Sequence, residues 1–254
     1  MPGMVRRPSR LVGLIVAVAV VVVGVLLWQR AGRSTEVPVA SAVGDFRAGG
    51  GAGSEPGAPT PGVYTYRATG TERGTVGPLN IDRDVPPTAR AVVRSTTRGF
   101  SLELRISEEH VEETRFVRTP RGLLAVWRRV DVRFLGIGRD DRRPLVPPVL
   151  TVPSASRVGA SWDSSFRAWK LSTTGRARVV RATTLSVSGT SYPVVVLEDR
   201  GRTSGAHGGP RLQRWWWSEQ LKLPIRIESD VTLGGVFGYR SKIRLDLASA
   251  TPAR

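Results

Sequence analysis

The sequence predicts an all-β ectodomain, an antiparallel curved sheet or half-barrel, on one N-terminal transmembrane α-helix. Three observations predict it: an uncharged apolar run near the N-terminus, a stretch rich in Gly and Pro, and a long segment in which apolar and polar residues alternate. They divide the chain into a cytoplasmic N-terminus (1–10), a transmembrane signal-anchor helix (11–28), a flexible tether (29–61), an extracytoplasmic antiparallel β domain (62–248) and a disordered tail (249–254).

The apolar run at 11–28 has no charged residue, and 13 of its 18 residues are Val, Leu or Ile. A helix of this length covers about 27 Å, close to the hydrocarbon thickness of a bilayer. Trp28 ends the run, where an indole ring is favoured at the membrane interface. Three arginines precede the run and two follow it: Arg6, Arg7, Arg10, Arg30 and Arg33. This bias predicts a single-pass protein of the cell membrane, with a cytoplasmic N-terminus and an extracytoplasmic C-terminal domain.

A cleaved secretory signal is the alternative interpretation of this run. Ala40-Ser41-Ala42 resembles a cleavage site, but it begins 12 residues after Trp28. The run is also longer than the roughly 7–15 apolar residues of a signal peptide core. We therefore expect an uncleaved anchor. The Gly and Pro residues of 29–61 favour irregular structure, so this segment is expected to tether the outer domain loosely.

The charge of the chain limits its partners. The formal net charge is +17, from 35 Arg and 3 Lys against 21 acidic residues. Such a balance is typical of proteins that bind nucleic acid, anionic lipid or an anionic wall polymer. An extracytoplasmic location and the absence of a nucleic-acid motif disfavour nucleic acid. The chain has no Cys, which excludes disulfides and zinc–thiolate sites.

Strands are predicted wherever apolar residues recur at every second position. The clearest alternation lies at 100–106, 223–227 and 243–247. Thr119-Pro120-Arg121-Gly122 fits a type I turn and predicts a hairpin between 111–118 and 123–135. A second Gly-rich turn at 232–235 separates the last two strands. The segment 139–156 contains four prolines and is predicted to be a long loop within one domain.

Three motifs in the C-terminal part resemble a known group of proteins. They are Val158-Gly159-Ala160-Ser161-Trp162, the hairpin-like run at 180–196, and Trp216-Trp217-Ser218-Glu219-Gln220-Leu221-Lys222-Leu223-Pro224. Together they resemble uncharacterised bacterial envelope proteins with an unclosed β-barrel similar to the lipoprotein-carrier fold, over residues 158–247. The resemblance implies a curved barrel that could handle a lipid or another amphiphile. Lys222 stands where these proteins have a turn glycine, and Gln220 replaces an acidic residue.

Catalytic, metal and cofactor sites are not predicted. His110 lies in an acidic run with Glu108, Glu109, Glu112 and Glu113, and the run is expected to be a solvated turn that pairs with arginines. Its spacing fits no calcium-binding loop. His207 lies in a Gly-rich loop that would position a catalytic base poorly, and no GxSxG motif is present. The sequence therefore predicts a protein that is not an enzyme.

The tryptophans are the main candidates for a ligand site. Trp215-Trp216-Trp217 lies in a predicted strand, so Trp215 and Trp217 should face one side and Trp216 the other. These rings could simply fill the core, or could join Trp162 and Trp169 in an apolar concave face that binds an acyl chain.

Basic residues on the last strands are a second candidate site. Arg226, Arg240, Lys242 and Arg244 could form an ordinary solvated face or could attract an anionic membrane or wall polymer. The leading hypothesis is a non-enzymatic module that binds an apolar or amphiphilic ligand outside the membrane. The alternative is an interaction protein that docks a protein partner or an anionic envelope polymer, and an enzyme comes third.

Overall fold

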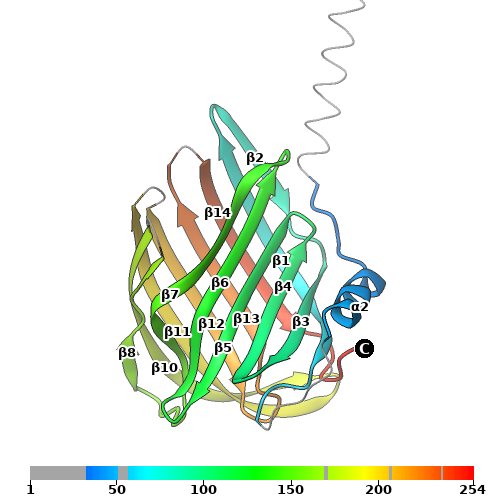
Figure 1. Ribbon diagram of the computed structural model, residues 1–254, viewed down its shortest axis with the longest axis vertical. Helices are drawn as coiled ribbons and strands as arrows, with labels where there is room; N and C mark the ends of the chain where they lie inside the picture. The colour runs from blue at the N-terminus through cyan, green and yellow to red at the C-terminus, as the bar shows by residue number, and fades with distance from the viewer. Residues whose placement is uncertain (1–32, 51–56, 169–170, 206–207, 236) are drawn as a thin grey trace, which may run out of the picture.

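The computed structural model describes residues 33–50, 57–168, 171–205, 208–235 and 237–254. The predicted membrane span at 11–28 lies outside these residues. Within the described parts of the chain, no helix combines the length and the apolar character that a membrane crossing requires. The described residues form one helix and fourteen strands, which surround a common interior (Figure 1).

The helix is α2 (Val39–Ala48). The strands are β1 (Gly62–Val76), β2 (Leu79–Asp84), β3 (Thr88–Thr96), β4 (Gly99–Ser107), β5 (His110–Thr119), β6 (Gly122–Phe134), β7 (Ile137–Pro153), β8 (Ser161–Asp163), β9 (Phe166–Ala168), β10 (Leu171–Val187), β11 (Thr190–Gly205), β12 (Gly209–Ser218), β13 (Leu223–Leu233) and β14 (Phe237–Leu247). The predicted all-β class is confirmed, as are the hairpins at 119–122 and 232–235.

The sheet closes into a barrel, so the predicted half-barrel is wrong on this point. Twelve antiparallel strands follow one another around the ring in the order β11-β12-β13-β14-β1-β3-β4-β5-β6-β7-β9-β10, and β10 returns to β11. The closure is weakest at one seam, where β7 pairs with β9 through Val146 and Arg167 alone. The two remaining strands each pair with one member of the ring, β2 with β1 and β8 with β10.

The predicted loop at 139–156 is instead mostly strand β7. Its prolines are accommodated because the β6–β7 ladder is interrupted there: Pro144 pairs with Trp127, and the next paired residue is Val149, opposite Ala125. Pro147 and Pro148 fall in the interruption, where a missing backbone N–H breaks no ladder hydrogen bond.

The predicted tether is structured over 33–50. In α2, Ala42 and Phe46 lie four residues apart and therefore on one face of the helix. They pack on the outside of the barrel against Val63 of β1 and Val92 of β3. This packing thus orders a segment that its Gly- and Pro-rich composition predicted to be irregular.

The predicted disordered tail at 249–254 is also ordered. Ala253 forms an antiparallel bridge with Val63, and the backbone oxygen of Arg254 accepts a 2.7 Å hydrogen bond from Arg47 of α2. The last residues therefore extend the packing of α2 against β1.

The two ends of the barrel differ. Val187 ends β10 and Leu223 begins β13 at the lower end of the barrel in Figure 1, and both are buried in one core cluster with Tyr66. The β10–β11 hairpin crosses this end, and its Ser188 hydroxyl donates a 2.8 Å hydrogen bond to the backbone oxygen of Ala248 beyond β14. The upper end carries the β1–β2, β4–β5 and β6–β7 turns (Figure 1). Space inside the barrel is therefore expected toward the upper end.

Candidate functional site

The interior of the barrel contains two connected chambers. The lower chamber has a volume of about 90 Å³ and the upper about 150 Å³, counted as the space that the centre of a water molecule can reach. One water needs about 10–15 Å³ in this measure, so each chamber has room for several waters or for part of an acyl chain. The chambers share five lining residues: Glu112, Leu145, Phe166, Arg128 and Arg211.

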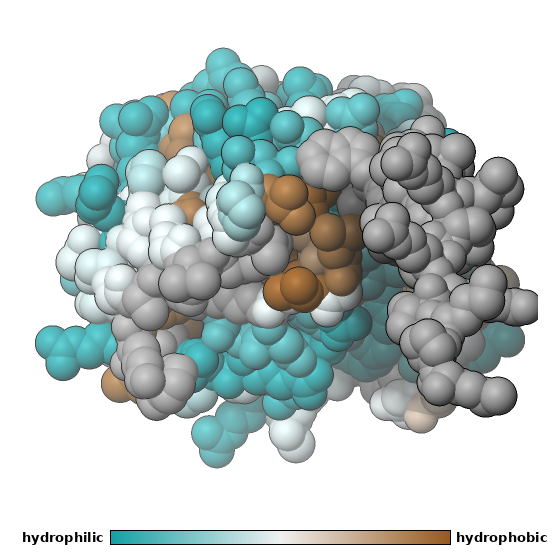
Figure 2. All heavy atoms as spheres, turned by 90° about the horizontal axis from the view of Figure 1, so that it is seen from above, coloured by the Kyte–Doolittle hydropathy of each residue, from teal (hydrophilic) through white to brown (hydrophobic). Residues whose placement is uncertain are grey.

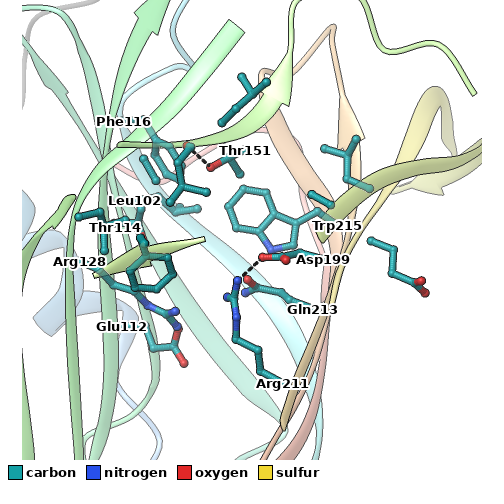
Figure 3. Close-up of a pocket in the computed structure, with 18 of the residues that line it drawn as sticks. Leu102, Glu112, Thr114, Phe116, Arg128, Thr151, Asp199, Arg211, Gln213 and Trp215 are labelled. Carbon is teal, nitrogen blue, oxygen red and sulfur yellow. Dashed lines mark hydrogen bonds and ion pairs between the residues drawn. The ribbon is translucent and has the colours of Figure 1, made fainter. Parts of the chain in front are cut away.

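The lower chamber is mostly apolar. Leu102 and Leu104 of β4 face it, together with Phe116 of β5 and Trp215 of β12 (Figure 3). The Phe116 and Trp215 rings meet edge to face, with centroids 6.0 Å apart. Alternation along each strand directs these side chains inward. The chamber therefore offers an aromatic and aliphatic wall of the kind that accepts a hydrocarbon chain.

A bulge in β6 changes the wall from apolar to charged. Phe116 pairs with Ala125 and Arg115 with Trp127, so Val126 is an extra residue in β6. The extra residue reverses the inward alternation. Both Ala125 and Arg128 consequently line the lower chamber.

Figure 3 shows Arg128 and Arg211 extending into the lower chamber from opposite walls. The Nη2 atom of Arg128 lies 2.6 Å from Glu112 Oε2, and Arg211 forms an ion pair with Asp199. Burial lowers the pKa of Arg211 and the charge of Arg128 lowers it further, whereas Asp199 opposes both effects. The Nε atoms of both arginines and the Trp215 indole nitrogen are buried without a hydrogen-bond acceptor. The site thus has unused donors beside an apolar wall.

A buried polar network continues upward from Glu112. His110 Nε2 lies 3.2 Å from Glu112, and its Nδ1 lies 2.5 Å from Glu72 Oε1. Glu72 also accepts a 2.8 Å hydrogen bond from Arg83 Nε and a 2.7 Å bond from the Tyr239 hydroxyl. The solvated turn predicted around His110 is therefore wrong at this residue, because His110 is only 1% exposed.

The network holds its charges despite burial. For His110, burial disfavours protonation, but the charge of Glu72 and hydrogen bonds to Glu112 and Glu72 outweigh it and raise the pKa to about 9. For Glu72, burial is likewise outweighed, chiefly by His110, and the pKa falls to about 2. His110, Arg83 and Arg128 then face two carboxylates, Glu72 and Glu112, a surplus of one positive charge. The chambers are also lined by Asp141, Glu198 and Asp199 and by Arg143 and Arg211, so the surplus belongs to this network alone.

The predicted tryptophan site is only partly assembled. Trp162 and Trp215 line the same lower chamber, and the Trp162 indole donates a 2.6 Å hydrogen bond to the Leu150 oxygen. Trp217 belongs to the core and donates to Glu219 at 3.0 Å. Trp216 lies beside the Arg226 guanidinium, 5.4 Å from its ring centroid. Trp169 is outside the described residues.

The predicted basic site is partly neutralised. Arg226 and Arg244 both pair with Asp246, at 2.5 and 2.7 Å. Arg240 is exposed, and Lys242 lines an outer groove that also contains Glu228 and Asp230. The groove therefore presents both signs of charge.

The interior polar residues were missed by sequence reasoning. A signal existed in β5, where His110, Glu112 and Thr114 occupy the same alternate positions as the buried Phe116. The β6 bulge hid the equivalent signal for Arg128. Lys222, expected at a glycine position, adopts a left-handed backbone with φ of 54°, so the turn geometry matches the glycine that it replaces.

Comparison with known proteins adds little to this description. No protein-family model matches the chain, and no curated protein is significantly similar to it. The crystal structure of the hypothetical lipoprotein YmcC from Escherichia coli (K12) is similar at 12% sequence identity and a TM-score of 0.30, covering 75% of this chain and 85% of that chain. A likeness at that TM-score supports no conclusion about this chain.

Proposed function

We propose that the protein is a non-enzymatic, membrane-anchored module that binds an amphiphile inside its barrel. The ligand would be a lipid-like molecule with an acyl chain and an anionic or hydrogen-bond-accepting group. The predicted anchor at 11–28 would place the barrel outside the cytoplasm. The observation that best supports this proposal is the junction of the two chambers, where an apolar wall lies beside Arg128 and Arg211.

The chemistry of this junction supports an amphiphile over a purely apolar ligand. Leu102, Phe116 and Trp215 would contact the acyl chain. The unused donors of Arg128 and Arg211 would face its polar group, because a buried donor without an acceptor is unfavourable. The outer basic face supports the alternative, polymer docking, less well, since Asp246 pairs with two of its four residues.

A photoreactive fatty acid tests the proposal directly. The full chain in lipid nanodiscs would be incubated with a fatty acid that carries a diazirine in its acyl chain, irradiated and digested. We expect crosslinks on inward residues of the lower chamber, such as Leu102 and Phe116. Crosslinks confined to 11–28, or to the outer face, would contradict the proposal.

A matched pair of variants on β10 controls this experiment. Ala177 lines the lower chamber, whereas Ala182 is exposed on the same strand. Ala177→Phe should fill the space and reduce interior crosslinking at least tenfold, and Ala182→Phe should leave it unchanged. Overpacking costs about 1–3 kcal/mol, so circular dichroism must show that both variants remain folded.

A further inference from the structure

The upper rim of the barrel carries three exposed apolar side chains. Leu79 begins β2 directly after the β1–β2 turn, and Leu135 and Ile137 flank Gly136 at the β6–β7 turn. They are 44%, 43% and 55% exposed. Figure 2, a view onto this end, shows a cluster of apolar side chains that is bordered in part by hydrophilic ones.

The two hairpin tips are held together. Arg83 of β2 stacks on Phe134 of β6, 4.1 Å from its ring centroid, and donates a 2.8 Å hydrogen bond to the Arg133 oxygen. Gly74 of β1 packs so closely on Phe134 that a Cβ would lie 2.5 Å from its ring. The two hairpins that carry the three apolar side chains are therefore braced against each other, and Leu79, Leu135 and Ile137 are together called the apolar rim.

Leu135 occupies an unfavourable backbone conformation. Its φ is 55° and that of Gly136 is 73°, the left-handed pair of a two-residue hairpin turn. Asn, Asp or Gly normally fills the first position, because a bulky residue there is strained by about 1 kcal/mol or more. Leu135 is therefore an exposed leucine at a position where both the contact with water and the left-handed backbone conformation favour a small polar residue.

The chain enters the described structure at this same end. Thr35 donates hydrogen bonds to Glu109 from its backbone nitrogen at 3.0 Å and its hydroxyl at 2.8 Å, and its oxygen accepts a 3.0 Å bond from Glu108 of the β4–β5 turn. Only seven Cα–Cα steps separate Thr35 from Trp28, which span at most about 25 Å. The attachment is far shorter than a tether over 29–61.

We infer that the apolar rim docks on the outer surface of the bilayer that holds residues 11–28, so that the upper chamber opens toward the membrane. The occupant is the lipid surface itself. The short attachment at Thr35 brings the upper end to the bilayer, and burial of Leu79, Leu135 and Ile137 holds it there. The inference rests on the anchored state in the proposed function, and it adds an orientation and a route by which lipid enters the barrel.

Two ion pairs near the rim compensate charges that would otherwise oppose docking. Arg73 pairs with Asp82 at 2.5 Å on the β1–β2 hairpin, and Arg133 pairs with Asp131 at 2.7 Å on β6. Because these charges are compensated locally, apolar burial is expected to dominate the docking. Added salt should therefore change it little.

Depth-dependent quenching tests the inference. The chain has no Cys, so Leu135→Cys, Ile137→Cys and, at the lower end, Thr97→Cys each give one labelling site in the full chain. Each variant would carry a bimane label in phosphatidylcholine–phosphatidylglycerol vesicles containing lipid with a spin-labelled head-group region. We expect at least threefold stronger quenching at 135 and 137 than at 97, unchanged in 0.5 M salt. Equal quenching at all three sites, no quenching, or failure of the chain to float with the vesicles would overturn the inference.

A second variant pair tests the apolar contribution. Leu79→Ser with Ile137→Ser should at least halve the quenching at Leu135→Cys, whereas Val158→Ser, at an exposed apolar residue outside the rim, should not. Unchanged quenching in the double variant would contradict docking by the rim. If lipid is found in the barrel but the labels at the rim are not quenched, the orientation alone is overturned. If the labels at the rim are quenched but no lipid is bound, the proposed function alone is overturned.

Discussion

Replacing Glu72 by glutamine is expected to lower the free energy of unfolding by about 3–5 kcal/mol, the usual range when one partner of a buried ion pair is removed. Glu72 and Arg83 have side chains that are 0% and 1% exposed, with Arg83 Nη2 2.7 Å from the carboxylate. His110 can release its proton when Glu72 is neutral, but Arg83 remains charged. Chemical denaturation of the full chain, followed by tryptophan fluorescence, measures the change.

Asp82→Asn is the matched control for this loss. It removes the acidic partner of Arg73 on the same β1–β2 hairpin, but both side chains are more than half exposed. Exposed ion pairs contribute about 0–1 kcal/mol, so this variant should unfold almost like the parent. Equal destabilisation by both variants would mean that the buried network does not stabilise the upper part of the barrel more than an exposed ion pair does.

Stability is expected to fall on the alkaline side of neutrality because of His110. Its pKa in the folded protein is about 9 against an ordinary value of 6.5. Protonated His110 therefore stabilises the fold fully below pH 6.5. This contribution to the free energy of unfolding, about 3 kcal/mol in total, is lost as the pH rises through 9. The pKa of Glu72 is lowered to about 2 from 4.5, so its contribution is present above 4.5 and is lost toward pH 2. These are two views of one ion pair and are not added.

His110→Gln identifies the source of the alkaline loss. His110 is the one histidine among the described residues, and the chain has no Cys to titrate in this range. The variant should be less stable at pH 6 and should lose the decline between pH 6.5 and 9. A parent protein whose unfolding midpoint stays flat over that range would show that His110 is not held protonated in the fold.

Local sequence patterns were sufficient for several strands, but not for β7 and not for the closure of the sheet. Alternation at 100–106 and 243–247 and the turn at Pro120 gave correct hairpins, because these features depend on neighbouring residues. Closure depends on β9, a three-residue strand that meets β7 at one residue pair. No local pattern reports such a contact. Likewise, α2 is ordered mainly by packing on Val63 and Val92, far along the chain.

The interior site was harder to predict than the fold. The acidic run around His110 was expected to be solvated and to pair with arginines, and Glu113, which pairs with the half-exposed Arg115, fits that expectation. Glu72 and His110 are exceptions, because their partners come from β1, β2 and β5, and only the closed barrel brings them together. Of the predicted site residues, Trp162 and Trp215 share a chamber because β8 and β12 both line it.

Native mass spectrometry of the full chain, released from its own membranes in nanodiscs, tests the central claim most directly. The account predicts a lipid-sized adduct that survives mild activation and carries an anionic group. The same preparation of Ala177→Phe should lose the adduct, and Ala182→Phe should keep it. A parent protein that is free of bound lipid, while folded and inserted in the membrane, would contradict an amphiphile-binding barrel.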